Sequence, residues 1–383
     1  MKIPALLTAL LLAALAACGT TEPAAAPPAP DAPQVAPVTL TDLRGKQITL
    51  PGPATRVVGL EWNVAEHAVS LGVMPVGVAD VAGYGKWVKA EPLGDVRQQR
   101  ALGERPDRHL AALDVAVGER EALPGPRRER RLARFQLRVE RREQHGGLRL
   151  LAGGRRDQLQ VAAHLAEVVL RVAALRPDLV LATDELPDTA VAQMERFAPV
   201  VFVAGGDAKD NLGQMRRKLE LLATATGKQA EASALLTAFD VKLEAGKAAL
   251  AARAGQRFAF ADGYVEGSQV SIRPYAKGSL LSAVTERLGM ANAWTEPGDP
   301  VYGLGQTDVE GLTRLGDATF LYIANDGDGG DPFTAVLGGN AVWRSLPFVQ
   351  EREVHRLPDG IWMFGGPTSM TQYVDAVVAA LGR

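Results

Sequence analysis

The sequence predicts an α/β protein organised around one long helix. Short apolar runs typical of buried strands alternate with amphipathic stretches of helical period on both sides of residues 228–253. Strands that alternate with helices in this way usually form parallel sheets from βαβ units. The chain of 383 residues is long enough for two such domains, and 47% of its residues are hydrophobic, which is sufficient for their cores.

The stretch from Lys228 to Arg253 is predicted to form the long helix, with Gly227 and Gly255 marking its ends. At about 1.5 Å per residue, such a helix spans roughly 40 Å, the width of a small domain. It is either the core helix of one large domain or a rod that joins two lobes, and we favour the rod. The small and apolar residues that recur every three or four positions form one stripe: Ala232, Leu235, Phe239, Leu243, Gly246 and Leu250.

The first residues predict export and lipid attachment. Lys2 gives a positive start, and the apolar run at residues 3–14 is too short to span a bilayer. Small residues then lead to Cys18, the single cysteine of the chain, in the sequence Leu-Ala-Ala-Cys. This pattern is similar to the bacterial lipobox. We therefore expect residues 1–17 to be a signal peptide and Cys18 to be the lipidated first residue of an extracytoplasmic protein.

The chain from Cys18 to Pro37 is rich in Ala and Pro, which predicts a flexible linker. The fold then begins near Val38 with a hairpin that turns at residues 44–46. The pattern that follows predicts a strand at 56–60, a helix at 64–71, a strand at 76–80 and then a loop. Several side chains stand where strands end, at the edge at which α/β sheets bind ligands: Glu61, Trp62, Asp80, Tyr84 and Trp87.

Residues 97–168 form an anomalous segment that is dense in Arg and nearly devoid of Lys. It sustains neither a helical nor a strand period. Three interpretations remain: a basic arm for an anionic partner, an unusual helical insertion, or a stretch not selected for folding, such as a frame-shifted part of the gene. We favour the third, because regular patterns return abruptly after residue 168, and we expect this segment to be disordered or irregular.

After the anomalous segment the alternation of strands and helices resumes. Apolar runs predict strands at 179–182, 200–203, 257–261, 270–275, 320–324 and 353–357. Amphipathic patterns predict helices at 212–224, 279–288, 307–315, 341–346 and 368–381. In the third of these, Thr307 and Glu310 stand in capping-box register.

Several classes of function are unsupported by the sequence. The formal charge of −2 gives no general case for nucleic acid. The five histidines lack the spacing of a zinc or manganese site, and the acidic stretch 326–331 lacks the glutamate that an EF-hand needs at position twelve, where Leu337 stands. Neither a nucleophile elbow nor a phosphate-binding loop is recognisable. We therefore expect a protein without catalytic activity, covalent cofactor or resident metal.

Seven short segments, in this order, resemble the iron-siderophore substrate-binding proteins of ABC importers, of the ferric citrate and hydroxamate type. They are RVVGLEWN at 56–63, LGVMPVGVAD at 71–80, ALRPDLV at 174–180, RPY at 273–275, DVEGL at 308–312, VWRSL at 342–346 and WMFGGP at 362–367. Together with the lipobox and the long helix, they cover most of the chain outside residues 97–168.

This resemblance implies a helix-linked periplasmic binding protein fold, with two Rossmann-like lobes facing each other across a shallow cleft. Residues 38–227 would form the N-terminal lobe, 228–254 the connecting helix and 255–383 the C-terminal lobe. The implied function is a monomeric, lipid-anchored protein of the cell envelope that delivers a ferric siderophore to the permease and ATPase of an ABC importer. A heme or cobalamin ligand on the same fold is the alternative, and an axial Tyr or His in the cleft would favour heme.

The resemblance also implies site residues. Arg273 matches a cleft arginine that would bind the oxygens of an anionic complex. The aromatic walls and rim of the cleft would consist of Glu61, Trp62, Trp87, Tyr275, Trp343, Trp362 and Phe364. Glu310 matches the C-lobe acid that docks on a permease arginine. The N-lobe counterpart is missing, because Leu170 stands in its place and Glu167 is out of register.

Overall fold

The computed structural model of the chain describes residues 36–93, 99–100, 117–118, 165–183, 186–266 and 269–382. Cys18, the predicted signal peptide and nearly all of the predicted linker lie outside these residues. Within the anomalous segment the structure describes only residues 165–168 and two short paired strands, β5 (Gln99–Arg100) and β6 (Val117–Gly118). None of the described helices has the length and apolar character that a membrane span requires.

The N-lobe contains a parallel four-stranded sheet, in the order β4-β3-β7-β8. Every residue of β7 and β8 is buried, as expected for strands covered on both faces. The strands are β3 (Val57–Gly59), β4 (Gly77–Val78), β7 (Leu179–Thr183) and β8 (Val200–Val203).

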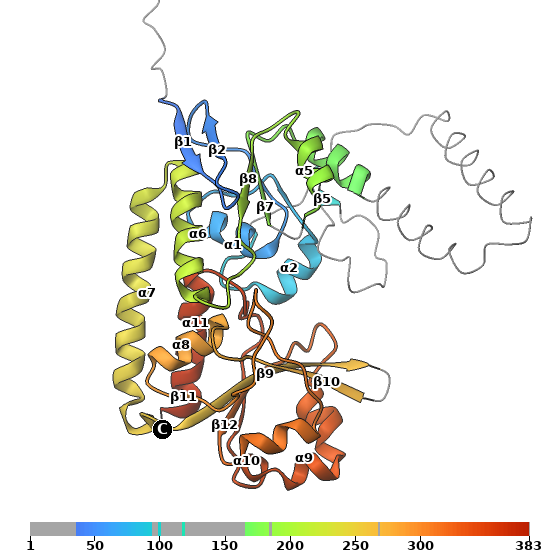
Figure 1. The fold of residues 1–383 in the computed structure, drawn as a ribbon, viewed down its shortest axis with the longest axis vertical. Coiled ribbons are helices and arrows are strands. Elements are labelled where there is room, and N and C mark those ends of the chain that lie inside the picture. The colour runs from blue at the N-terminus through green and yellow to red at the C-terminus, as the bar shows by residue number, and fades with distance from the viewer. Residues whose placement is uncertain are drawn as a thin grey trace, which may run out of the picture. The chain divides into compact units, whose positions relative to one another are not determined.

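The N-lobe helices surround this sheet, and an antiparallel hairpin precedes it (Figure 1). The hairpin consists of β1 (Val38–Thr41) and β2 (Gln47–Leu50), and the helices are α1 (Trp62–Ser70), α2 (Val81–Trp87), residues 165–174, α5 (Asp188–Met194) and α6 (Asn211–Thr226). The prediction of a loop at the place of α2 was wrong. Asp80 begins a helix there, since its side chain accepts a hydrogen bond from the Gly83 N–H and caps the first turn.

The long helix α7 (Gln229–Ala249) confirms the predicted rod. Its N-terminal part packs in the N-lobe core through Ala232, whereas Phe239 and Leu243 pack in the core of the C-lobe. Figure 1 shows α7 running beside α6 and then beside α11 (Pro367–Leu381). At Gly246 the approach is so close that an added Cβ would lie 2.7 Å from Val374 Cγ1 of α11. The apolar stripe of α7 therefore joins both lobes.

The C-lobe contains a mixed sheet in the order β10-β9-β12-β13, with β11 also paired to β9. β10 is antiparallel to β9, and the other pairings are parallel. The strands are β9 (Arg257–Glu266), β10 (Gln269–Pro274), β11 (Ala291–Asn292), β12 (Thr319–Ile323) and β13 (Val354–Leu357).

The α-helices of the C-lobe are α8 (Leu280–Arg287), α9 (Ala341–Ser345), α10 (Pro347–Gln350) and α11. Short helical turns are η2 (Ala251–Arg253), η3 (Glu310–Leu315), η4 (Pro332–Val336) and η5 (Leu337–Gly339).

The prediction of an α-helix from Thr307 was also wrong. The backbone of Thr307 exchanges two hydrogen bonds with Ile272 of β10, which holds it in an extended bridge. The 3₁₀ turn η3 begins only at Glu310. Asp308 rather than Thr307 supplies the polar contact, because its carboxylate accepts from the Gly311 N–H. Pairing with β10 thus overrides the local capping signal.

Candidate functional site

Two of the predicted residues lie where β3 leads into α1. The Glu61 carboxylate accepts a hydrogen bond from the Asn63 N–H at 2.9 Å and so caps α1. The Trp62 indole Nε1 donates to the Ala79 carbonyl at 2.9 Å, which ties the ring to the end of β4. The ends of two neighbouring strands therefore fix Trp62 at the edge of the sheet that faces the C-lobe.

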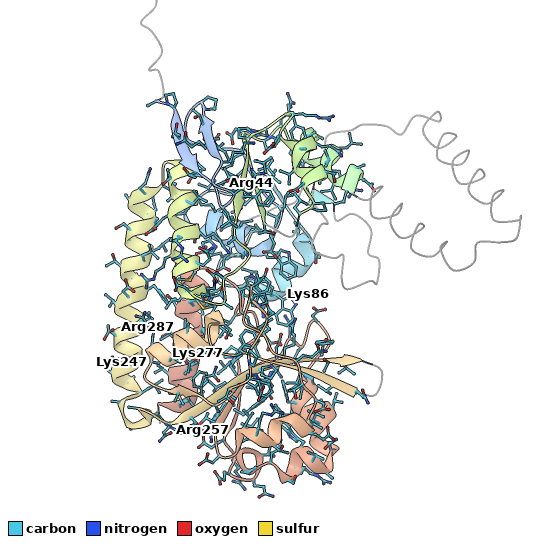
Figure 2. The ribbon with its side chains drawn as sticks, in the orientation of Figure 1. Arg44, Lys86, Lys247, Arg257, Lys277 and Arg287 are labelled. Carbon is cyan, nitrogen blue, oxygen red and sulfur yellow. The ribbon has the colours of Figure 1, made fainter. Side chains whose placement is uncertain are left out.

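A loop of the C-lobe holds the end of α2. Trp87 Nε1 donates to Asp328 Oδ2 at 2.9 Å, and Lys86 Nζ lies 3.5 Å from the other oxygen of the same carboxylate. Asn325 Nδ2 donates to the Lys86 carbonyl at 2.8 Å. Figure 2 shows Lys86 at the end of α2, beside this loop. Trp87 thus lies at the lobe interface, by which we mean the surfaces of α1, α2 and α6 that meet residues 300–304, 325–328 and 360–370.

A chain of aromatic contacts crosses the lobe interface. The rings of Trp62 and Trp362 meet edge to face, with centroids 5.0 Å apart. Trp362 in turn contacts Phe364 at 5.2 Å, and Phe364 stacks on Tyr275 at 6.2 Å. The structure therefore brings together Trp62, Trp362, Phe364 and Tyr275 from distant parts of the sequence. The first three are partly exposed, whereas Tyr275 is buried beneath them.

Tyr302 belongs to the same cluster but was missed by the sequence reasoning. Its ring meets Phe364 edge to face at 5.0 Å. It lies on a loop in which Asp299 accepts hydrogen bonds from the N–H groups of Val301 and Tyr302, both at 2.8 Å. The signal in the sequence was the Gly-Asp-Pro-Val-Tyr-Gly stretch at 298–303, a turn that carries an aromatic residue.

Arg273 lies on β10 and is paired within its own lobe. Its Nε donates to Asp262 Oδ1 at 2.9 Å, and its Nη2 contacts Asp262 Oδ2. Asp262 is the cross-strand neighbour on β9 and is 5% exposed. Burial raises the pKa of Asp262, although the nearby guanidinium acts in the opposite direction. The guanidinium also lies 5.7 Å from the centre of the Tyr264 ring.

Trp343 does not lie with the other predicted residues. It is 3% exposed and packs in the C-lobe core against Phe320, Phe333 and Phe348, with ring centroids 5.6–5.8 Å away. The short helix α9 begins at the Asn340 cap and turns this indole into the core. We therefore correct the expectation that Trp343 lines the lobe interface.

A cavity opens beside the aromatic cluster, with an empty volume of about 330 Å³. Both lobes contribute to its walls, which are formed by Gly205, Asn211, Gln214, Met215, Lys218, Leu280, Tyr302, Phe364 and Gly365. Close behind it, burial lowers the pKa of His67 to about 4, so that this imidazole is neutral at pH 7. Both ring nitrogens of His67 face backbone carbonyls, those of Asn63 and Met215.

Metal ligation has no support in the described part of the chain. There, no three His, Cys, Asp or Glu side chains lie close enough together to hold a metal ion. The aromatic cluster instead offers flat apolar surface and backbone groups. Such a surface suits an organic ligand with a delocalised or apolar skeleton.

Comparison with known proteins gives a consistent result. The family model described as "Periplasmic binding protein" matches residues 169–360. The iron(3+)-hydroxamate-binding protein FhuD of Escherichia coli is 21% identical over 336 residues, which cover 85% of this chain and 87% of that protein.

Two solved structures show the likeness in fold. The siderophore-binding protein FhuD of Vibrio cholerae, bound to Fe³⁺-Desferal, superposes with a TM-score of 0.59 at 23% identity over 86% of this chain and 98% of that one. The triscatecholate siderophore-binding protein FeuA of Bacillus subtilis, complexed with ferri-bacillibactin, gives a TM-score of 0.56 at 15% identity, covering 90% of this chain and 97% of that one.

Proposed function

This chain belongs to the periplasmic binding protein family, and on that premise we propose that it binds a ferric siderophore between its two lobes for delivery to an ABC importer. The aromatic chain that links Trp62, Trp362 and Phe364 across the lobe interface is the observation that carries the proposal. These rings come from both lobes, so a ligand that inserts between them contacts both at once. Trp87 and Tyr302 extend the same surface, and Tyr275 supports it from below.

The ligand takes the place of contacts that the lobes now make with each other. Trp62 and Trp362 touch, and the adjoining cavity is small. A wrapped iron chelate therefore separates the two rings and lies between them, and its organic skeleton replaces the edge-to-face contact. Iron reaches the protein already coordinated by hard oxygen ligands, so the protein itself needs no metal ligands.

Charge at the lobe interface favours a complex of low net charge. Arg273 and Lys86 each already face a carboxylate, those of Asp262 and Asp328. The fork on Asp262 uses Nε and Nη2 of Arg273. We propose that the remaining nitrogen of Arg273, Nη1, contacts oxygen atoms of the ligand. A neutral ferric hydroxamate suits this balanced site better than a highly anionic ferric citrate or catecholate complex.

Heme and cobalamin are the alternative ligands. An axial His or Tyr pointing into the site would favour heme. His67 is buried with backbone carbonyls next to its ring nitrogens, and the Tyr275 O–H lies 3.1 Å from Met363 Sδ. Tyr302, which lines the cavity, is therefore the phenol that a heme would have to use. Burial also raises the pKa of Tyr275 well above its usual value, which opposes a phenolate ligand.

Docking on the permease is proposed to use Glu310. This residue is exposed at the start of η3, where its carboxylate can meet an arginine of a membrane partner. The N-lobe offers Leu170 at the corresponding place, a residue that is 57% exposed on the helix 165–174. Glu167 on the same helix forms an ion pair with Arg171. We propose that docking is therefore weaker through the N-lobe than through the C-lobe.

The remaining parts of the proposal concern the ends of the chain and its organisation. We propose that Cys18 carries the lipid anchor in the cell envelope, with residues 1–17 removed and residues 18–37 as the tether. We also propose a monomer that acts by binding rather than catalysis, with lobe boundaries at 38–227 and 255–383 joined by the helix region 228–254.

A titration of protein lacking residues 1–35 tests the ligand. Tryptophan emission is followed while Fe³⁺-Desferal, ferric citrate, a ferric catecholate, heme or cobalamin is added. We expect saturable quenching by Fe³⁺-Desferal, whose tris-hydroxamate iron core is neutral, at the lowest concentration. Saturable binding of heme or cobalamin with none of the ferric complexes bound would contradict the proposed ligand class.

A further inference from the structure

Glu66 lies fully buried at the lobe interface and caps a helix of the opposite lobe. It belongs to α1 of the N-lobe, and its Oε1 accepts a hydrogen bond from the Ser369 N–H of α11 at 3.3 Å. An N–H in the first turn of a helix has no acceptor within the helix. The Gly366 cap of α11 supplies no side-chain hydrogen bond, and Pro367 has no N–H. The start of α11 therefore depends on Glu66.

The second oxygen of Glu66 and the Ser369 hydroxyl of the same turn are both buried without a hydrogen-bonding partner in the part of the chain that the structure describes. A Cβ built on Gly365 would lie 2.4 Å from Glu66 Oε2 and 2.9 Å from Ser369 Oγ, so both atoms line one small space. A neutral carboxyl group fits there, because its O–H can donate to Ser369 Oγ while Oε1 accepts from the backbone. Burial of the ionised form costs much more free energy than burial of the neutral form.

Some buried polar atoms of the same interface lack hydrogen-bonding partners within the described ranges. Their desolvation weakens the contact between the lobes and so favours its reversible opening. Asn63 Oδ1 and Trp362 Nε1 are buried there without a hydrogen-bonding partner among the described residues. Separation of the lobes hydrates such groups and recovers part of their desolvation free energy. Contacts of this kind suit an interface that has to admit a ligand.

The titratable groups around Glu66 leave it as the principal proton-binding group of this contact. Glu91, which follows α2, repels it, and burial also raises the pKa of Glu91. Tyr84 of α2 stays protonated, since burial and the two carboxylates raise its pKa far above neutrality. His67 of α1 is neutral, because burial and the nearby charge of Lys218 on α6 both lower its pKa. On α11, residues 367–370 carry no charge.

We propose that Glu66 is a proton-dependent latch between the lobes, which takes up a proton when α1 docks on the first turn of α11 and releases it when they separate. Burial raises the pKa of Glu66 from 4.5 to about 7 in the docked arrangement. In the separated lobes the carboxyl is hydrated and its pKa returns toward the lower value. Docking is therefore most favourable below pH 4.5 and weakens as the pH rises toward 7.

Amide hydrogen exchange at Ser369 in the ligand-free protein tests the latch, independently of which ligand the protein binds. The Ser369 N–H is hydrogen-bonded to Glu66, so its protection reports docking directly. After correction for the intrinsic pH dependence of exchange, we expect protection to fall by roughly 80-fold between pH 4.5 and 7, out of about 300-fold over the whole titration. Circular dichroism over the same range checks that the fold is retained.

Three variants complete the test. Glu66→Gln retains the carbonyl acceptor without a titratable proton, and we expect its Ser369 protection to be independent of pH. Glu91→Gln removes the repelling charge, so we expect a smaller fall that is complete at a lower pH. Glu220→Gln, an exposed position on α6, should match the wild type. The latch would be overturned if protection of Ser369 in the wild type did not change with pH, or if it fell equally in Glu66→Gln. Should Glu66→Gln fail to fold, a transition in Glu91→Gln at the same pH as in the wild type would also overturn it.

Discussion

Arg273 and Asp262 are paired across two strands of the C-lobe sheet, with the guanidinium Nε 2.9 Å from the carboxylate Oδ1. The carboxylate is almost completely buried, whereas the arginine is partly exposed. Arg273 therefore neutralises a buried charge. An arginine that balances a carboxylate adds polarity and shape to a site, but adds little net attraction for an anion.

Substitution of Arg273 should lower stability in a pH-dependent way. Arg273→Met leaves Asp262 buried without its partner, at a cost of about 1–3 kcal/mol. Because the pKa of Asp262 is already raised in the fold, we expect the loss to be largest at high pH and to shrink as Asp262 is protonated in acid. Urea denaturation between pH 4 and 8 measures this. The double variant Asp262→Asn/Arg273→Met should recover part of the loss, and a single variant as stable as the wild type would contradict the pairing argument.

The two tryptophans Trp362 and Trp343 should have opposite effects when replaced. Trp362→Ala should weaken binding of Fe³⁺-Desferal by roughly tenfold or more, because an apolar surface worth about 1.5 kcal/mol is lost. Trp343→Phe should leave affinity unchanged and reduce stability by about 1–3 kcal/mol, because it opens a gap in the C-lobe core. Titration and thermal denaturation of both variants check this. Loss of affinity in Trp343→Phe at unchanged stability would restore Trp343 to the site.

The attachment of α7 to the C-lobe should depend on Gly246. Any side chain there meets Val374 and Leu288, whose methyl groups would lie 2.7 and 2.9 Å from a Cβ. We expect Gly246→Val to destabilise the protein by about 1–3 kcal/mol, the usual effect of overpacking. Gly85→Ala is the control: no atom lies within 4 Å of a Cβ at this helical position, and we expect up to about 1 kcal/mol of gain. Equal stability of the Gly246→Val variant and the wild type in urea would show that the packing is looser than described.

Charge reversal at Glu310 should separate delivery from binding. We expect Glu310→Lys to leave siderophore affinity unchanged and to reduce uptake by permease-containing vesicles strongly, because the carboxylate that pairs with the permease is replaced by a cation. Glu351→Lys, another exposed position of the C-lobe, should have little effect. Leu170→Glu should increase uptake by supplying the acid that the N-lobe lacks. Unchanged uptake by Glu310→Lys would rule out this docking site.

Much of the fold was predictable because the spacing of apolar residues along the sequence indicates which helices and strands are buried. The stripe on α7 and the continuous apolar runs of β7, β8 and β12 report burial directly. The wrong predictions have two different causes. Asp80 adopts a left-handed backbone, with φ of 39°, while capping α2, which is a local contact, whereas a bridge to the distant strand β10 keeps Thr307 out of a helix. The period of apolar residues reveals neither contact.

The candidate site was predictable only in part. Trp62 directly follows a strand, and Trp362 lies in the recognisable WMFGGP motif, so both could be expected at the ligand-binding edge. Trp343 sits in an equally recognisable motif but turns inward, because the direction of a side chain on a five-residue helix depends on tertiary packing. Tyr302 was missed since its loop is held by Asp299, a contact that no periodic pattern encodes.

Fluorine NMR of protein labelled with 5-fluorotryptophan locates the ligand most directly. Five tryptophans report on the chain, and Fe³⁺ broadens the resonances of those that lie close to it. On addition of Fe³⁺-Desferal, with the Ga³⁺ complex as diamagnetic control, the account predicts selective broadening of Trp62, Trp87 and Trp362, while Trp294 and Trp343 stay sharp. Broadening of Trp343 or Trp294 alone, or bound ligand without broadening at Trp62 and Trp362, would contradict a siderophore site between the lobes.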